Sequence, residues 1–173
     1  MKRIQPILRF LRHIFTPHWR VKKAFSHQAL RNIEHAIIAS ETRHSGQIRF
    51  AVEANLSLHQ LLNRFSPKKR AIQVFSDLRV WDTAQNNGVL IYLLMADRDV
   101  EIVADRGIHQ QVGSDGWEAI CKQMESQFKL GHFEVGVLEG IESISRHLTQ
   151  FSPPAFSVYK VQKNELSDQP VIL

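Results

Sequence analysis

Cysteine is nearly absent from this 173-residue sequence, which contains only Cys121. A single cysteine excludes an internal disulfide framework and a multi-cysteine metal site. The apolar neighbours of Cys121 on a predicted helix favour a buried small hydrophobic side chain over a reactive thiol. The sequence also lacks a glycine-rich phosphate loop and an HExxH zinc motif. It therefore carries no strong signature of catalysis, and we assign no catalytic residue from it.

Long apolar runs are also missing, because no stretch approaches the roughly 20 apolar residues that a membrane-spanning helix needs. The chain begins with basic residues, as secretory signals do. However, Arg9 and Arg12 interrupt its apolar part, and no small-residue cleavage site follows. We therefore expect an uncleaved cytoplasmic protein that could lie peripherally on the inner membrane face.

Acidic residues are absent from residues 1–25, which contain seven of the 22 lysines and arginines. The rest of the chain has 15 basic residues against 17 acidic ones, so the body is mildly acidic although the whole chain carries +5. This asymmetry indicates an interaction arm and argues against a nucleic-acid-binding body. We expect no nucleic-acid partner.

The basic arm also has the spacing of an amphipathic helix. Its apolar residues recur at intervals of three and four: Ile4, Ile7, Leu8, Leu11, Ile14 and Phe15. Such a helix can lie in the plane of an anionic membrane, with aromatic residues as interfacial anchors. The residues expected to make this contact are Arg3, Arg9, Arg12, Phe15, Trp19 and Arg20. Three alternatives stay open for residues 1–24: contact with an anionic membrane or a membrane protein, packing on their own domain or a partner, and disorder.

The central feature of the body is an unbroken apolar run from Val89 to Ala96, which follows the turn residues Asn87-Gly88. A short apolar run bounded by turns is typical of a strand buried on both faces. The chain turns at Asp97-Arg98-Asp99 and returns through a shorter antiparallel strand to a second turn, Asp105-Arg106-Gly107. Because a strand buried on both faces needs helices above and below it, we predict an α/β fold. Its architecture is a three-layer helix–sheet–helix sandwich with a small mixed central sheet.

Helices and one further strand flank this hairpin in the sequence. The spacing predicts a helix over 26–44 with Ser26 as its cap, and a strand over 47–53 with one face buried. A short helix or helical loop at 57–65 precedes a helix that begins at Ser66-Pro67. Ser114 or Asp115 is expected to cap a further helix, and Gly131 separates it from the last one.

Three parts follow from this pattern. Residues 1–25 form a basic amphipathic N-terminal arm, residues 26–150 form the α/β domain, and residues 151–173 form a C-terminal tail. The tail is polar and weakly patterned, so we expect it to be extended or loosely attached.

The order and spacing of these pieces resemble the TPM domain family over roughly residues 33–148. The resemblance is carried by Thr42-Arg43-His44-Ser45-Gly46 before the strand Gln47–Val52, Ala71–Phe75, Asp82-Thr83, Asn87–Leu93, Asp97-Arg98, Asp105–Ile108, Trp117, Phe128, Gly131, Phe133 and Gly136. It implies an α/β sandwich around a small sheet. Members of the family are linked to divalent-cation binding, to an acid-phosphatase-like activity and to membrane-associated roles. The family usually has an acidic residue where this chain has Gln47, and often another where Asn87 stands.

The predicted topology brings several polar residues to one end of the sheet. The first strand and the parallel central strand start there, the third strand ends there, and the first helix and the loop at Trp81-Asp82 arrive there. The side chains expected to gather are Glu41, Gln47, Asp82, Asn87 and Asp105. Oxygen ligands of this kind suit calcium or magnesium. The alternative is that the turn residues among them only hydrogen-bond to their own backbone.

The opposite end of the sheet offers a second crevice, with Glu53, Asp97, Arg98 and Asp99. Ligands favour the carboxyl ends of parallel strands, although Asp97-Arg98-Asp99 is also an adequate hairpin turn. The first functional hypothesis is a binding or scaffold module that binds a divalent cation and associates peripherally with a membrane. The alternative, taken from the resemblance, is a cation-dependent acid-phosphatase-like hydrolase of phosphomonoesters.

Overall fold

The predicted hairpin forms part of the central sheet, with its buried strand inside the sheet and its return strand at the edge. The computed structural model describes residues 6–152 and 164–173. Strands β2 (Gly88–Leu94) and β3 (Asp99–Ala104) pair antiparallel, and β1 (Gln47–Glu53) runs parallel to β2 on its other side. A short strand, β4 (Val171–Ile172), completes a sheet of order β3-β2-β1-β4. Every residue of β2 is buried, as the unbroken apolar run predicts.

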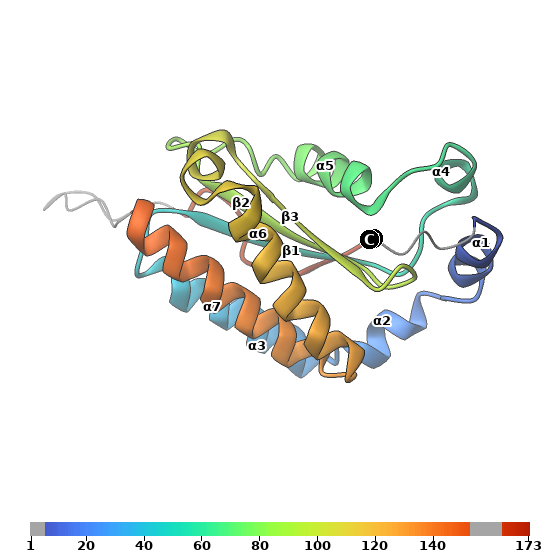
Figure 1. The fold of residues 1–173 in the computed structure, drawn as a ribbon. Helices are drawn as coiled ribbons and strands as arrows, with labels where there is room; N and C mark the ends of the chain where they lie inside the picture. The colour runs from blue at the N-terminus through green and yellow to red at the C-terminus, as the bar shows by residue number, and fades with distance from the viewer. Residues whose placement is uncertain (1–5, 153–163) are drawn as a thin grey trace, which may run out of the picture.

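Helices cover both faces of this sheet (Figure 1). In chain order they are α1 (Pro6–Ile14), α2 (Trp19–Ala24), α3 (His27–Glu41), α4 (Leu58–Leu62), α5 (Pro67–Asp77), α6 (Arg106–Lys129) and α7 (Phe133–Phe151). Helices α3, α6 and α7 pack on one face, where Ile91 of β2 joins their core. Helix α5 packs on the other, with the neighbouring residue Tyr92. The predicted three-layer α/β sandwich is confirmed.

Local signals set several helix ends as predicted. Ser26 Oγ accepts a hydrogen bond from the backbone N–H of Ala29 over 3.1 Å and caps α3. Ser66 caps α5 in the same way, with Pro67 at the first helical position. Helix α3 ends at Glu41 and is shorter than the predicted range of 26–44.

Helix α6 begins earlier than predicted and consists of two segments. Asp105 caps the first segment, which the sequence did not predict, and its Oδ1 accepts a hydrogen bond from the N–H of Arg106 over 2.6 Å. At Gly113 the backbone leaves helical geometry, with φ of 74° and ψ of 167°, which glycine tolerates because it has no Cβ. The second segment follows this kink, where the sequence predicts a helix start at Ser114 or Asp115. Aspartate favours turns and helix caps alike, so the sequence did not distinguish the two structures at this point.

The prediction that β1 has only one buried face was also wrong, because all seven of its residues are buried. Its polar residues are satisfied by partners on the second face. Arg49 donates to the carbonyl oxygen of Ser167, and Glu53 accepts two hydrogen bonds from the guanidinium of Arg70, over 2.9 and 3.1 Å. Tyr92 also donates to Glu53, over 2.5 Å. The alternating polar residues of β1 are therefore buried, and burial is tolerated because each polar group has a hydrogen-bond partner.

The last ten residues are attached to the sheet, so the expectation of loose attachment is wrong for 164–173. Val171 pairs with Ala51 of β1, and the N–H of Leu173 donates to the carbonyl oxygen of Val52 over 3.0 Å. Leu166 packs on the same core as α5. Residues 153–163 of the predicted tail lie outside the described residues.

The first prediction concerns Gly88, where β2 begins. A Cβ at this position would lie 2.0 Å from the carbonyl oxygen of Val80. Backbone cannot rotate away as a side chain can, so Gly88→Ala must displace β2 or the preceding loop. We expect the free energy of unfolding to fall by about 1–3 kcal/mol, measured by urea denaturation. A variant as stable as the wild type contradicts this close approach.

Candidate functional site

At the amino ends of the parallel strands, the side chains of Glu41 and Gln47 hydrogen-bond to each other. Gln47 Nε2 donates to Glu41 Oε2 over 3.1 Å, and the backbone N–H of Ile48 donates to Glu41 Oε1 over 2.8 Å. Gln47 Oε1 accepts from the backbone N–H groups of Glu165 and Leu166, at 2.9 and 3.0 Å. These two predicted cation ligands therefore join the end of α3, the start of β1 and the C-terminal tail.

The other three predicted ligands lie around the same edge but have different partners. The N–H of Asp105 donates to the carbonyl oxygen of Gly88 over 2.8 Å, which brings the end of β3 beside the start of β2. Asn87 is buried, and its Nδ2 donates to Ser45 Oγ over 3.2 Å. Asp82 is exposed in the loop before β2. The topology thus brings the polar corners to one edge, where their side chains form separate groups.

These groups do not make a complete oxygen shell for calcium, which takes about 6–8 oxygen ligands. Among the described residues, no group of three or more His, Cys, Asp or Glu side chains could hold a metal ion. Asp105 Oδ2 is nevertheless buried without a hydrogen-bond partner, so it could still accept a cation. The calcium or magnesium site therefore stays a prediction, with Asp105 as the residue on which to test it.

At the opposite end of the sheet, Asp97 joins the N-terminal arm to the body. Its carboxylate accepts from Arg9 Nε over 3.1 Å at one oxygen and from Arg9 Nη2 over 2.8 Å at the other. His13 Nε2 lies 3.2 Å from Asp97 Oδ1, and His13 Nδ1 accepts from the N–H of Leu56 over 2.9 Å. Burial alone would raise the pKa of Asp97, but the hydrogen bonds from His13 and Arg9 outweigh it and lower the pKa. Asp97 is thus an ionised anchor for the arm.

Sequence reasoning missed this anchor because the partners lie more than 80 residues apart. The available signal is the spacing of Arg9 and His13, which puts both on one face of a helix. Of the other residues in the predicted crevice, Glu53 is paired with Arg70, and Arg98 is exposed. Burial, followed by the charge of nearby Glu101, raises the pKa of Asp99 to about 7.

Helix α1 packs on the body by its polar side. Arg9, His13 and Thr16 lie at i, i+4 and i+7 and face the body, where the backbone oxygen of Thr16 accepts from Asn55 Nδ2 over 2.7 Å. With about 3.6 residues per turn, Leu11 falls on the opposite side of the helix. The apolar side is consequently open to solvent, and its exposed members are Ile7, Leu8, Leu11, Ile14 and Phe15.

The predicted membrane-contact residues differ in their exposure to solvent. Arg12, Phe15, Trp19 and Arg20 are exposed, whereas Arg9 points to Asp97. Arg3 lies outside the described residues. Within the part of the chain that is described, no helix has the length and apolar character to cross a membrane. The exposed apolar side of α1, together with α2, is the second candidate site.

The second prediction concerns the pH dependence of stability. Burial raises the pKa of Glu41 to about 8, although the hydrogen bond from Ile48 opposes the shift. The folded chain therefore holds this proton more tightly than the unfolded chain, and ionisation of Glu41 costs stability as pH rises from about 4.5 through 8. Relative to Glu41→Gln, which cannot ionise, the wild type should lose up to about 4 kcal/mol between pH 5 and 8.5.

Thermal unfolding of both proteins across this range measures the difference. Glu118→Gln is the matched control, because Glu118 is exposed and its pKa is lowered by Lys122. Its ionisation is therefore complete below the pH range of the test. Parallel curves for the wild type and Glu41→Gln contradict the prediction.

The third prediction tests the cation. Calcium that binds only the folded chain must raise the midpoint of thermal unfolding as its concentration exceeds the dissociation constant. Asp105→Asn, which removes the unpartnered carboxylate oxygen, should abolish this rise. Asp115→Asn, an exposed position on α6, should leave it intact. An unchanged wild-type midpoint at millimolar calcium argues against the site.

The comparisons with known proteins agree with this architecture. The model of the TPM domain matches residues 21–147. The structure is similar to the NMR structure of BA42 from the psychrophilic bacterium Bizionia argentinensis, with a TM-score of 0.72, 28% identity, and 86% of this chain and 94% of that one covered. The N-terminal domain of a protein from P. gingivalis has the same fold, with a TM-score of 0.58, 14% identity, and 86% and 93% covered. No curated protein matches the sequence. The chain belongs to the TPM domain family.

Proposed function

We propose that this TPM domain is a peripheral membrane-binding module, held on an anionic lipid surface by α1 and α2. The observation that carries the proposal is the exposed apolar side of α1, which includes Ile7 (74% exposed) and Phe15 (69% exposed). Trp19, at the start of α2, is 58% exposed. Large apolar side chains gathered on one helix face, rather than scattered singly, mark an interaction surface.

The basic residues of α1 and α2 indicate that the partner surface is anionic. Arg12, Arg20, Lys22 and Lys23 are exposed beside the apolar residues, and residues 1–25 contain no acid. Each basic side chain near an anionic membrane contributes roughly 1 kcal/mol, and each apolar side chain that is fully buried contributes about 1.5–3 kcal/mol. An anionic lipid surface satisfies both groups at once, whereas a neutral apolar partner leaves the basic residues without a counter-charge.

The anchor at Asp97 fixes which way this surface points. Because Arg9 and His13 are bound to the body, α1 cannot turn its apolar side inward without breaking the part-buried ion pair of Arg9 with Asp97 and the hydrogen bonds of His13. Such a break would leave the carboxylate of Asp97, whose side chain is only 5% exposed, without its cation. Packing of the arm on its own domain and contact with a membrane are therefore compatible, because they use opposite sides of one helix.

The hydrolase alternative has no comparable support. Glu41 and Gln47 are hydrogen-bonded within the fold, so neither is free to position a nucleophilic water in the described arrangement. A phosphatase also needs positive groups placed around the transferred phosphoryl group. It stays a hypothesis that an assay on a generic phosphomonoester can test.

The fourth prediction follows from the exposed side of α1. The wild type should co-sediment with vesicles that contain anionic phospholipid, and high salt should weaken binding. The double variant Leu11→Gln with Phe15→Gln should lower the partition coefficient at least about tenfold, because it removes apolar area without touching the core. Point variants are preferable to deletion of the arm, because Val21 is fully buried in the core.

Ile72→Gln is the matched control. Ile72 is a similarly exposed apolar residue, but it lies on α5. This variant should bind vesicles as the wild type does. If the wild type stays in solution, or if the α1 and α5 variants bind equally, the membrane proposal is wrong. Binding only when a membrane protein is present would point to a protein partner.

A further inference from the structure

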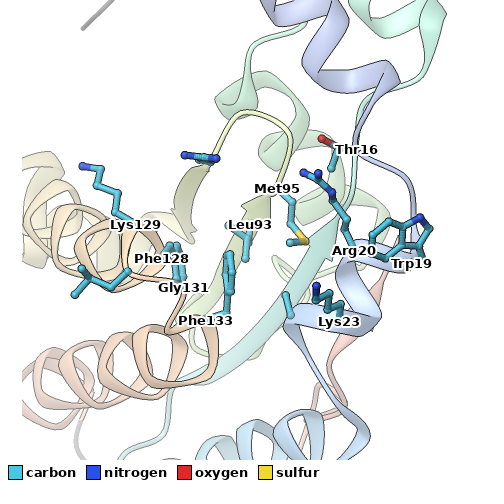
Figure 2. A pocket seen from close by; sticks show the side chains of 13 residues that line it. Thr16, Trp19, Arg20, Lys23, Leu93, Met95, Phe128, Lys129, Gly131 and Phe133 are labelled. Carbon is cyan, nitrogen blue, oxygen red and sulfur yellow. The ribbon is translucent and has the colours of Figure 1, made fainter.

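A pocket of about 610 Å³ opens between α2, the end of β2 and the connection from α6 to α7. Figure 2 shows Trp19, Arg20 and Lys23 on the α2 side, with Phe128 and Phe133 facing them across the pocket. The pocket lies at the carboxyl end of β2, which is the end of a parallel pair where α/β sheets commonly bind ligands. Its volume is within the range of about 300–1,000 Å³ that small-molecule sites occupy.

Positive charge converges on this pocket from three parts of the chain. Its charged lining residues are Arg20 and Lys23 of α2, Arg98 of the β2–β3 turn and Lys129 at the end of α6. No carboxylate lines the pocket, and within the described residues none of these four side chains forms a salt bridge. The neighbouring acid, Asp97, is already paired with Arg9. The pocket thus lacks an internal counter-ion for four cations.

The rest of the lining is largely apolar. Leu93 and Met95 come from the end of β2 and the residue after it, and Phe133 from the start of α7 (Figure 2). Phe133 is held in place by stacking on Phe128, with ring centroids 5.5 Å apart. A free inorganic anion would satisfy the cations and leave the partly exposed Met95 and Phe133 against water. The lining fits a ligand that carries an anion and an apolar chain together.

The geometry points to a binding site for an anionic phospholipid, with its phosphate among the basic side chains and part of an acyl chain along Met95 and Phe133. Arginine suits this role because its planar guanidinium can donate two hydrogen bonds to one phosphate. The inference deepens the proposed membrane function, because Trp19 and Arg20 belong both to the pocket and to the membrane-facing surface. It makes the module selective for a lipid rather than merely attracted to negative charge.

The fifth prediction tests the pocket without any membrane. The chain has three methionines, Met1, Met95 and Met124, so methyl-labelled methionine gives the full-length protein a reporter in the pocket. Met124 is fully buried outside the lining and serves as the internal control. Titration with monomeric dihexanoyl phosphatidylglycerol should shift the Met95 methyl signal and leave that of Met124 in place.

Two comparison ligands separate the sources of binding. Dihexanoyl phosphatidylcholine has the same chains and phosphate but no net charge, and inorganic phosphate has charge without chains. Each should bind at least about tenfold more weakly than the phosphatidylglycerol, because it lacks one of the two interactions. Equal binding of inorganic phosphate overturns the acyl-chain part of the proposal, and equal binding of phosphatidylcholine overturns selectivity for the anion.

Adjacent lysines on α2 provide the matched variants. Lys23 lines the pocket and Lys22 does not, although both are exposed. Lys23→Gln should weaken binding of the soluble phosphatidylglycerol at least about fivefold, because it removes a charged hydrogen bond to the lipid. Lys22→Gln should weaken this binding by less than about twofold, because it removes only a nearby exposed charge. Equal losses, or an unmoved Met95 signal, overturn the site.

The two proposals can fail separately. Vesicle binding should fall in both Lys22→Gln and Lys23→Gln, since each removes one exposed charge from the same helix, and it should fall further in Lys23→Gln, which also removes a pocket contact. If the wild type does not co-sediment with vesicles but the Met95 signal shifts with the soluble lipid, the pocket proposal is supported and the membrane proposal is wrong. If vesicles bind but Met95 does not respond, only the pocket is wrong.

Discussion

The complete burial of β2 is the constraint on which the rest of the structure depends. Its seven residues lie between two helical layers, so polar groups near either end of the strand must find partners inside the protein. At the carboxyl end Asp97 binds Arg9 and His13, which attaches the N-terminal helix. At the amino end of the neighbouring strand, Gln47 binds the backbone of residues 165 and 166. The same requirement for hydrogen bonds thus ties both ends of the chain to the sheet.

The sequence predicted well those features that depend on nearby residues. The apolar run before Asp97 predicted the buried strand, and Ser26 and Ser66-Pro67 predicted helix starts, because each signal acts within a few positions. The same local reasoning missed the first segment of α6, which precedes the kink at Gly113. An aspartate before Arg106-Gly107 fits a turn and a cap equally well, so the residues around it did not identify this helix start.

Long-range attachments could not be predicted in this way. Strand β4 is two residues long and follows a proline, so it has too little pattern to be recognised. Its place depends on an open edge of β1 and on Gln47, more than 100 residues earlier. The candidate cation residues illustrate the same limit. Topology predicted correctly that polar corners gather at one edge, but not that Glu41 and Gln47 would accept hydrogen bonds from backbone N–H groups.

Helix α1 shows why amphipathic spacing alone does not reveal which face of a helix meets its own domain. A surface helix usually buries its apolar side, and that is how such a pattern is interpreted. Here the polar side faces the body, because Arg9 and His13 on that side hydrogen-bond to the carboxylate of Asp97, which follows the buried strand β2. Leu56 N–H donates to His13 Nδ1, so the ring proton lies on Nε2 and points to Asp97. Two directional hydrogen bonds on one imidazole fix the rotation of the helix about its axis. The apolar side of α1 is consequently held outward by the same carboxylate that completes the sheet.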